Sequence, residues 1–452
     1  MNRKKFVQNI TIGEYVIHFA LSRWCHHEDS HDIFGNPLQD FPLQGGDVAY
    51  LEISNSKIVL KNDIAGCFRV YWWEDQLHKE IFVTDNVFSF LTEEELNSWQ
   101  KNEYEDQYFS KHGYTSGDST AYAGIHKIPP FGTLIIDDNG ARITSEWIKN
   151  IDYRGGKVET FRKVVAESME KIFSTLKDAD FPIVLCFSGG VDSYYLAKVM
   201  KSMGIPFEGV YFFHKINSKK KDLRLAQKKA SELGFRLRVV DISSMYDEQI
   251  EKVIRQLCYF DRHGYRYHFY GVQAIREIWG PNTLIVNGQN SDSILSFGPS
   301  ERKFTSLWKR YLLYGHNLFI KKVLSSIIGT AFHKKFTLPI TKEERGRALY
   351  DNFKYCLLLD HDDPKEYTQY IDRKIAVIQE QFDFRKESEF WLYLKFYTHI
   401  QGSDSQVVVS SAQYHNLRLL MPFVSKSFIQ AVLCYKNDQL ELYHPKYVLQ
   451  IE

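Results

Sequence analysis

The sequence predicts a mixed α/β and α+β fold. We expect an antiparallel β-sandwich in residues 1–152, then a parallel sheet with helices and a helical C-terminal part in residues 156–452. Three observations lead to this fold class. Short runs that alternate apolar and polar residues fill the first part. Strand patterns alternate with helical patterns in the second part. A Gly/Lys stretch, residues 153–157, separates the two where the hydrophobic period changes.

Turn residues divide the first part into strands that fit antiparallel hairpins. Asn-Ser, Asp-Gln and Asn-Gly pairs stand between the alternating runs, and such pairs favour tight turns. One helix is expected to interrupt these strands, near residues 92–100. The expected strand regions are residues 14–22, 47–63, 67–75, 80–88 and 132–147.

The second part predicts a parallel sheet, because each strand pattern is followed by a helix before the next strand. It begins with a helical pattern over residues 158–176, and from Gly288 to about Tyr435 nearly the whole chain has helical spacing. The expected strands are residues 182–188, 206–214, 236–243 and 282–288, with helices from Ser193 and over residues 222–233.

Composition limits the classes of partner. Lys and Arg number 57 against 56 Asp and Glu in 452 residues, so no basic excess favours nucleic acid. The six cysteines form no CxxC pair, which fits reduced thiols in the cytoplasm. The least polar long segment, residues 307–332, is interrupted by lysine, arginine and histidine, which argues against a membrane span. We expect a soluble cytoplasmic protein that binds neither membrane nor nucleic acid.

The strongest local signal is LCFSGGVDS, from Leu185 to Ser193, between a predicted strand and a predicted helix. Consecutive glycines let backbone N–H groups approach an anion, and the positive end of the helix adds to the attraction. The run predicts a phosphate-binding loop made of Ser188, Gly189, Gly190, Val191, Asp192 and Ser193. The alternative is an ordinary strand-to-helix turn with a capping serine.

Asp192 lies inside this anion-binding loop, where its carboxylate would repel phosphate unless a divalent cation stood between them. The sequence therefore implies Mg²⁺ as well as a nucleotide. The lysine of a Walker A loop is missing, so a different type of phosphate loop is expected.

The motif SGGVDS resembles the pyrophosphate loop of the N-type ATP pyrophosphatases, which cleave ATP between its α and β phosphates. Four further blocks are similar to the asparagine synthetase superfamily. The resemblance implies a synthetase domain over residues 156–452 that binds ATP and Mg²⁺. The blocks are Lys221-Asp222 with Ala226 and Ala230, residues 287–292 (NGQNSD), residues 411–423 and residues 444–449 (HPKYVL).

Residues 1–152 resemble the glutaminase-type domain of that superfamily through three blocks, near residues 61–71, 82–85 and 123–132. Such glutaminases use an N-terminal Cys whose own amino group is the base. Asn2 stands in its place, and Cys25 could serve only after removal of a propeptide. We therefore expect a degenerate domain, as in the β-lactam synthetases and lasso-peptide macrolactam synthetases.

The resemblance also implies roles for single residues. Asp192 and Asp292 would hold Mg²⁺, Lys446 would stabilise the tetrahedral intermediate, and Gln289 would stand where asparagine synthetases have a Glu. Leu185, Phe213 and Gly288 are expected to join the loop in binding the nucleotide. Ser293 and Gln450 depart from the family pattern, and an amide such as Gln289 cannot act as a base. Glu387 and Glu389 are candidate bases, or simply members of a solvated helix face.

The predicted function is therefore ATP-dependent amide-bond formation through an acyl-adenylate, with a small-molecule or peptide carboxylate and an amine as substrates. A homodimer or a pathway partner protein stays open. The alternatives are ammonia-dependent amidation of a small acid, a tRNA-thiolating or lysidine-forming enzyme, and a nucleotide-binding pseudoenzyme. Three weaker candidates are metal ligands within residues 25–32, triphosphate contacts from Lys219 to Lys221, and a basic, aromatic substrate surface over residues 302–335.

Overall fold

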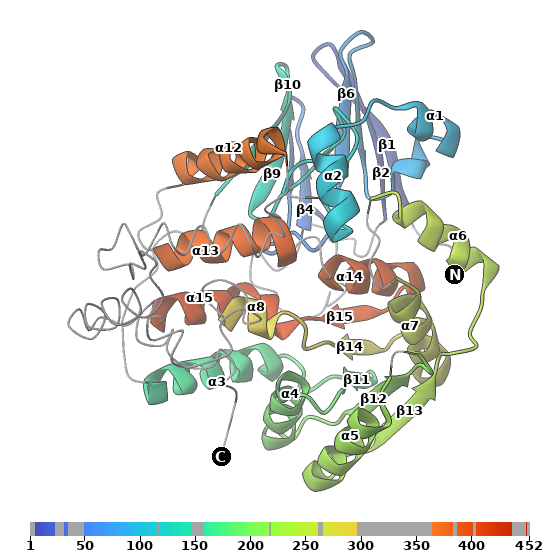
Figure 1. The fold of residues 1–452 in the computed structure, drawn as a ribbon, viewed down its shortest axis with the longest axis vertical. Coiled ribbons are helices and arrows are strands. Elements are labelled where there is room, and N and C mark those ends of the chain that lie inside the picture. Colours follow the sequence, from blue (N-terminus) through green and yellow to red (C-terminus); the bar gives the residue numbers. More distant parts are fainter. Residues whose placement is uncertain are drawn as a thin grey trace, which may run out of the picture. The chain divides into compact units, whose positions relative to one another are not determined.

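The structure is a computed structural model, drawn with its labelled helices and strands in Figure 1. The chain forms two compact units. The first unit comprises Met1–Asn150, Ala166–Ser291 and Lys395–Gln430, and the second comprises Ile151–Val165, Asp292–Leu394 and Ala431–Glu452. The predicted domain boundary, between residues 152 and 156, lies outside the described residues and stays a prediction. The structure describes residues 5–22, 31–34, 49–115, 117–146, 158–216, 218–260, 265–295, 364–382, 387–400, 404–435 and 449.

Two five-stranded sheets come from the N-terminal part, in the orders β1-β2-β7-β6-β8 and β10-β9-β5-β4-β3. The expected hairpins form at β4–β5 and β9–β10, but β2 pairs with β7 in parallel, so one predicted antiparallel neighbour is wrong. The strands are β1 (Lys5–Ile12), β2 (Tyr15–Ser22), β3 (His31–Phe34), β4 (Ala49–Ile53), β5 (Ile58–Lys61), β6 (Tyr71–Asp75), β7 (Glu80–Thr84), β8 (His126–Lys127), β9 (Gly132–Asp137) and β10 (Gly140–Ser145).

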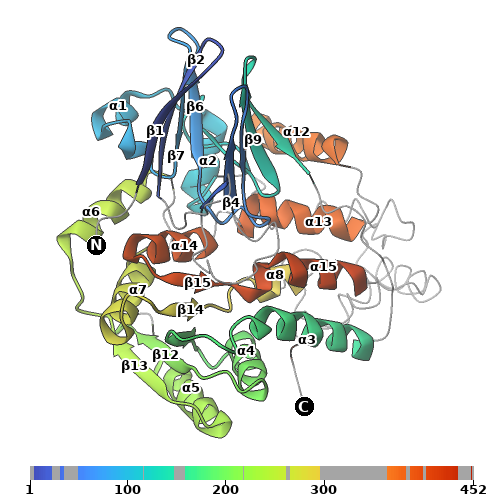
Figure 2. The same cartoon turned by 180° about the vertical axis from the view of Figure 1, so that it is seen from behind.

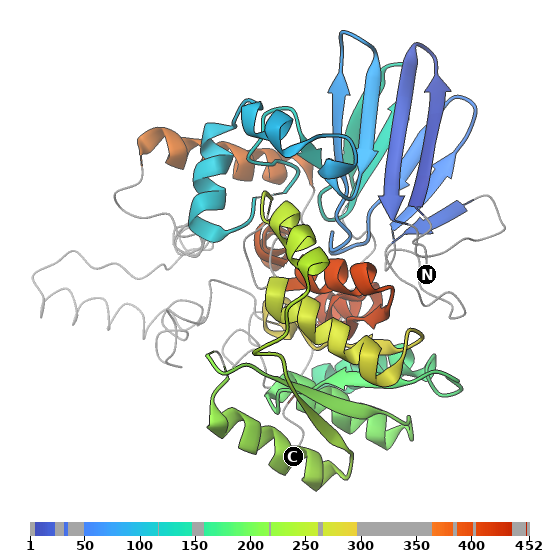
Figure 3. The same ribbon diagram turned by 90° about the vertical axis from the view of Figure 1, so that its right-hand side faces the viewer.

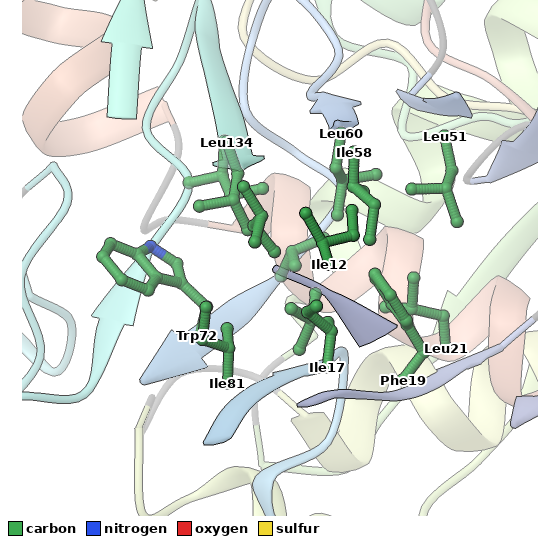
Figure 4. Packing of buried hydrophobic residues seen from close by; sticks show 14 of the residues in the cluster. Ile12, Ile17, Phe19, Leu21, Leu51, Ile58, Leu60, Trp72, Ile81 and Leu134 are labelled. Atoms are coloured by element: carbon green, nitrogen blue, oxygen red, sulfur yellow. The ribbon is translucent and has the colours of Figure 1, made fainter. Parts of the chain in front are cut away.

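These two sheets share one hydrophobic core. Ile17 and Phe19 of β2 belong to the same buried cluster as Leu60 of β5 and Leu134 of β9 (Figure 4). The cluster takes alternate residues from each strand, because successive side chains of a strand point to opposite faces of the sheet. The alternation read from the sequence therefore marks the buried face correctly.

Two helices accompany these sheets. Helix α1 (Glu93–Ser98) matches the predicted helix, and Thr92 and Glu95 form a capping box at its start. Helix α2 (Glu103–His112) was not predicted. Its signals were local: Asn102 accepts a hydrogen bond from Glu105 N, and Gly113 ends the helix in the left-handed conformation.

The first unit also contains a parallel sheet, in the order β13-β12-β11-β14-β15 (Figure 2). Every neighbouring pair in it is parallel, as the alternation of strands and helices predicted. Strand β15 was not expected, because its three residues lie in a segment read as helical. The strands are β11 (Ile183–Cys186), β12 (Glu208–Phe213), β13 (Leu237–Asp241), β14 (Leu284–Val286) and β15 (Arg418–Leu420).

Helices cover both faces of the parallel sheet (Figure 3). Helices α4 and α5 lie on one face, and α7 and α14 lie together on the other, where Phe269 contacts Tyr414. The helices of this unit are α4 (Val191–Ser202), α5 (Lys220–Leu233), α6 (Glu248–Leu257), α7 (Tyr265–Trp279) and α14 (Asp404–His415).

The described residues after Gly288 are mostly helical, as predicted. Among the described residues no helix is both long and apolar enough to cross a membrane. Helix α3 (Val158–Ser174) matches the predicted helix over residues 158–176. The others are α8 (Ser291–Leu295), α12 (Lys365–Gln381), α13 (Glu387–Lys395) and α15 (Lys426–Tyr435). Within the described chain, Cys67, Cys186, Cys258 and Cys434 form no disulfide.

Candidate functional site

The predicted phosphate loop follows β11, the central strand of the parallel sheet. Strands β12 and β13 lie on one side of β11, and β14 and β15 lie on the other. The chain leaves β11 toward β12 on one side and leaves β14 toward β15 on the other, so the carboxyl ends of β11 and β14 border a topological switch point. Open parallel sheets bind ligands at this place. The loop after β11 and the turn after β14 are thus the candidate site.

Gly189 gives the loop its shape. Its φ of +74° is the left-handed conformation, and a Cβ at this position would stand 2.7 Å from the Cα of Ala226. Ala226 and Ala230, on α5, are buried at 0% and 2% exposure. These two alanines, part of a predicted block, let α5 pack directly under the loop. A larger residue at either contact would push the loop away from the helix.

Two serine hydroxyls meet inside the loop. The Oγ atoms of Ser188 and Ser193 lie 3.3 Å apart, and the Ser188 Oγ accepts a hydrogen bond of 3.2 Å from the Gly190 backbone N–H. Ser188 is exposed and Ser193 is buried. The exposed hydroxyl can donate its own proton to an incoming anion, because its contact with Gly190 uses only a lone pair.

Helix α4 begins in the loop with its backbone donors uncapped. Gly190 is the residue before the helix, and no side chain caps this end. The first N–H groups of a helix have no partner within it, so those in the first turn of α4 are available to an oxyanion. The alternative interpretation, a turn closed by a capping serine, is therefore wrong for α4.

Lys229 is a site residue that the sequence interpretation missed. Its Nζ donates a 2.8 Å hydrogen bond to the Gly189 carbonyl and lies 4.7 Å from the ring centroid of Tyr194. The signal was available, since residues 226, 229 and 230 share one face of a helix. Lys229 therefore holds the loop carbonyl and places a positive charge beside the predicted phosphate loop.

The turn after β14 packs against the first turn of α4. A Cβ on Gly288 would lie 3.2 Å from Leu196 Cδ1 and 3.7 Å from Asp192 Cβ. The Asn287 side chain accepts a 3.0 Å hydrogen bond from Gln289 N, which holds the turn. The predicted residues Gly288 and Asp192 therefore lie side by side.

Two polar atoms of this turn are buried without a hydrogen-bond partner among the described residues: Oε1 of Gln289 and Oγ of Ser291. Buried polar atoms in folded proteins are nearly always paired, with protein or with ligand or water. Both residues follow Gly288, which packs against the first turn of α4. The two atoms are acceptors that a substrate N–H or O–H group can satisfy.

The remaining predicted nucleotide contacts lie in the strands. Leu185 is fully buried within β11, so only the residues after it reach the site. Phe213 is the half-buried last residue of β12. Cys186 is the last residue of β11. Burial raises the pKa of its thiol to about 12, although its hydrogen bond with Asn287 lowers the pKa by a smaller amount. Cys186 is therefore a neutral thiol at the edge of the site.

The predicted magnesium ligands have different surroundings. Asp192 is half-buried in the first turn of α4, and Asp292 is exposed in the first turn of α8. Asp292 begins the second unit, and its pairing with Asp192 stays a prediction. Asp192 fits a magnesium ligand, because Mg²⁺ is usually bound by one or two carboxylates together with substrate phosphates. No group of three or more His, Cys, Asp or Glu side chains within the described ranges could hold a metal.

Several predicted residues cannot be placed. Lys446, Gln450, Cys25 and the surface over residues 302–335 lie outside the described residues. Glu389 is only 2% exposed, so the solvated-face interpretation is wrong for this residue. The lysines from Lys219 to Lys221 are exposed where α5 begins.

Comparison with protein-family models and with curated proteins finds no match. Solved structures do match in part. The U34-tRNA thiolase NcsA from Methanococcus maripaludis, with its [4Fe-4S] cluster, is 15% identical over 55% of this chain and 88% of its own, with a TM-score of 0.25. NMN synthetase from Francisella tularensis is 10% identical over 54% of this chain and 96% of its own, with a TM-score of 0.23.

A predicted subunit of tRNA methyltransferase from Methanocaldococcus jannaschii is 23% identical over 25% of this chain and 54% of its own, with a TM-score of 0.18. At such low TM-scores these likenesses carry no argument about activity. The case for a function therefore rests on the geometry of the loop and the turn.

Proposed function

We propose that this chain is an ATP-dependent ligase that forms an amide bond through an acyl-adenylate, releasing AMP and pyrophosphate. The observation that carries the proposal is the loop Ser188–Ser193 at the switch point of a parallel sheet. Gly189 is left-handed there, α4 starts uncapped, and Lys229 holds the loop from below. This arrangement suits a pyrophosphate leaving group.

The first step transfers AMP to an acid. A carboxylate oxygen of the substrate bonds to the α-phosphorus of ATP, and the bond from that phosphorus to the pyrophosphate breaks. The loop N–H groups and the Ser188 hydroxyl stabilise the charge that develops on the pyrophosphate. Mg²⁺ on Asp192, with Asp292 as the second predicted ligand, would supply further charge neutralisation.

The second step joins the acid to an amine. The amine nitrogen bonds to the acyl carbon, AMP leaves with the electrons of the broken C–O bond, and the nitrogen gives up a proton to solvent water. Gln289 cannot take this proton, but its buried Oε1 can accept a hydrogen bond from the amine and orient it. Lys446 is proposed to stabilise the negative charge of the tetrahedral intermediate.

Asp192→Asn tests the first step. The substitution keeps the shape of the side chain and removes its charge, so pyrophosphate release that depends on a carboxylate substrate should fall about 100-fold or more. Products are measured from ATP with Mg²⁺, and AMP with pyrophosphate is the expected pair. The control is Asp178→Asn, at an exposed position. Release of ADP, or full activity of Asp192→Asn, would refute the proposal.

Lys446→Ala tests the second step. We expect ATP binding and acyl-adenylate formation to persist, whereas the amide product falls by about 100-fold, because one stabiliser of the intermediate is lost. Trapping the adenylate with hydroxylamine separates the two steps. An unchanged yield of amide would remove Lys446 from the mechanism.

A further inference from the structure

A second site lies at the same edge of the parallel sheet. A cavity of about 1000 Å³ opens beside the carboxyl ends of β12 and β13, where His214, Ile216, Ile242 and Ser243 follow those strands, and α6 and α7 line its other side. Its volume is at the upper end of pockets that take small organic ligands. None of the residues proposed to bind ATP lines it.

An arginine on α7 is held in a fixed position in this cavity. Arg266 donates from Nε and Nη2 to Oε2 of Glu251, at 3.0 and 2.6 Å, and the Tyr270 hydroxyl donates to Oε1 at 2.8 Å. The Glu251 side chain is 6% exposed, whereas that of Arg266 is 74% exposed. Both carboxylate oxygens of Glu251 therefore accept hydrogen bonds, whereas the other N–H groups of the exposed Arg266 side chain can bind a ligand.

Such an arrangement favours an anionic group of matching shape. A guanidinium group binds carboxylates through parallel N–H donors, and fixing it in advance lowers the entropy cost of binding. Arg255, on α6, adds a second positive charge to the lining. A carboxylate of the ligand therefore belongs beside Arg266.

The cavity also holds an acid that can bind a cation. Glu93, the first residue of α1, lines the cavity and is exposed, so its carboxylate is accessible to a ligand, whereas that of Glu251 is buried. Among the acidic residues, lysines and arginines, the lining has two arginines and two glutamates, whose charges balance. A ligand that carries one positive and one negative charge matches this balance.

Apolar and aromatic side chains make up much of the remaining wall. Tyr259, Tyr267 and Tyr270 line the cavity together with Ile254 and Met245. Two large side chains are strongly exposed at its border, Ile216 at 87% and Tyr246 at 74%. A contiguous exposed apolar patch can mark a ligand-binding groove. The body of the ligand should therefore be aromatic or branched aliphatic.

We propose that this cavity binds an apolar amino acid or a short peptide as a zwitterion, with its carboxylate on Arg266 and its ammonium group on Glu93. The ligand's role as a substrate of the ligase rests on the function proposed above, but its binding does not. Tyr267, in the cavity wall, also contacts the Phe212 carbonyl in β12, next to β11, at 3.3 Å. The cavity therefore borders the strand beside the phosphate loop.

The dipeptide Phe-Leu, without ATP, is the first probe. Calorimetry should show that Phe-Leu binds to the full chain. Phe-Leu amide and N-acetyl-Phe-Leu should bind about 10- to 100-fold more weakly, because each lacks one charge-assisted contact. Absence of binding by Phe-Leu and by phenylalanine at millimolar concentration would overturn the proposal, as would equal binding of all three dipeptide forms.

Variants assign each charge to its residue. In Arg266→Gln, Phe-Leu and its amide should bind equally, and in Glu93→Gln, Phe-Leu and its N-acetyl form should bind equally. Because Arg266→Gln leaves Glu251 buried without its cation, the double variant Glu251→Gln/Arg266→Gln repeats the test with both charges removed. Arg236→Gln and Glu94→Gln are the controls, since both side chains are exposed and neither lines the cavity.

Competition separates this site from the nucleotide site. AMP should leave the affinity for Phe-Leu unchanged or raise it, whereas competitive displacement by AMP would show that the cavity holds the nucleotide and would overturn the proposal. Pyrophosphate release from ATP is measured apart from peptide binding. Binding that depends on Arg266 and Glu93 would stand even if no AMP were formed, so the failure of one proposal is distinguishable from that of the other.

Discussion

Position 189 requires glycine for two separate reasons. Its φ is left-handed, and its Cα lies against the backbone of α5, so both its conformation and its lack of a side chain matter. Gly204, shortly after the end of α4, has a φ of +70°, but a Cβ added there would meet no atom within 4 Å. Comparing substitutions at Gly189 and Gly204 therefore separates the free-energy cost of the left-handed conformation from that of the close contact.

Gly189→Ala should therefore destabilise the protein more than Gly204→Ala. Each change costs about 1–2 kcal/mol for the left-handed conformation, and Gly189→Ala adds a Cβ contact at 2.7 Å with Ala226. Denaturant unfolding gives the free energies, and a fluorescent ATP analogue gives affinity. We expect only Gly189→Ala to lose ATP binding. Equal stability and equal binding of the two variants would contradict the close packing.

The reactivity of the Cys186 thiol should depend on pH. Burial raises the pKa of its thiol to about 12, so the reactive thiolate is scarce at pH 8 and is favoured only as the pH rises toward that value. Its alkylation rate by iodoacetamide should rise about tenfold per pH unit from pH 8 to pH 10. Mass spectrometry of the Cys186 peptide measures the rate. A rate that levels off near pH 9 would indicate an ordinary thiol.

Helix α5 is the element that supports the phosphate loop. It brings Ala226 against Gly189 and Lys229 to the Gly189 carbonyl. Lys228, its neighbour, instead forms an exposed ion pair with Glu232 at 3.8 Å. Adjacent lysines on this helix therefore have different roles, one toward the loop and one toward solvent.

Lys229→Met should raise the dissociation constant for ATP about tenfold, because a hydrogen bond from a charged group that orders the loop contributes about 1.5–3 kcal/mol. Lys228→Met should leave that constant unchanged, since exposed ion pairs contribute little. Titration with ATP in the presence of Mg²⁺ measures both. If the two variants bind ATP equally well, Lys229 does not support the loop.

Elements with a strong local period were predictable, and those that depend on distant partners were not. The helix expected near residues 92–100 is present as α1, and the apolar run of residues 182–188 is present as β11. Strand β15 has only three residues and exists because Leu419 pairs with Ile285 of β14. That partner is far away in the sequence, so no local pattern around residue 419 could reveal it.

The same distinction holds for the candidate site. Ser188 to Ser193 could be predicted because one contiguous motif carries the loop. The cavity that contains Arg266 and Glu251 could not, since its residues come from separate elements and none stands in a recognisable motif. Glu251 looked like any helical glutamate until its burial and its two hydrogen-bonded oxygens were visible.

At the scale of the whole first unit, one aromatic residue connects two distant parts of the chain. Phe260, shortly after α6, belongs to the same buried cluster as Tyr71 and Tyr122, with ring centroids 4.6 and 5.3 Å away. Gln406 of α14 adds a 3.3 Å hydrogen bond to the Gly66 carbonyl. Residues of the N-terminal sheets and of the parallel-sheet region therefore share buried contacts.

Phe260→Ala should cost about 3–5 kcal/mol, because it removes a buried aromatic ring from this shared cluster. We expect one unfolding transition in the wild type to separate into two, since the sheets lose part of their coupling. Calorimetry and near-UV circular dichroism follow both transitions. Leu77→Ala, at a side chain that is 85% exposed, is the control with little effect. A single unshifted transition in Phe260→Ala would show that this contact is unimportant.

The parallel pairing of β2 with β7 has a consequence for synthesis on the ribosome. Residues Val16 to Ala20 find their partners only at Glu80 to Thr84, so the hairpin of β1 and β2 emerges with one row of backbone groups unmatched. Such a row is a template for aggregation. Nascent chains that stall before residue 80 should therefore be the form of this protein that most needs a chaperone.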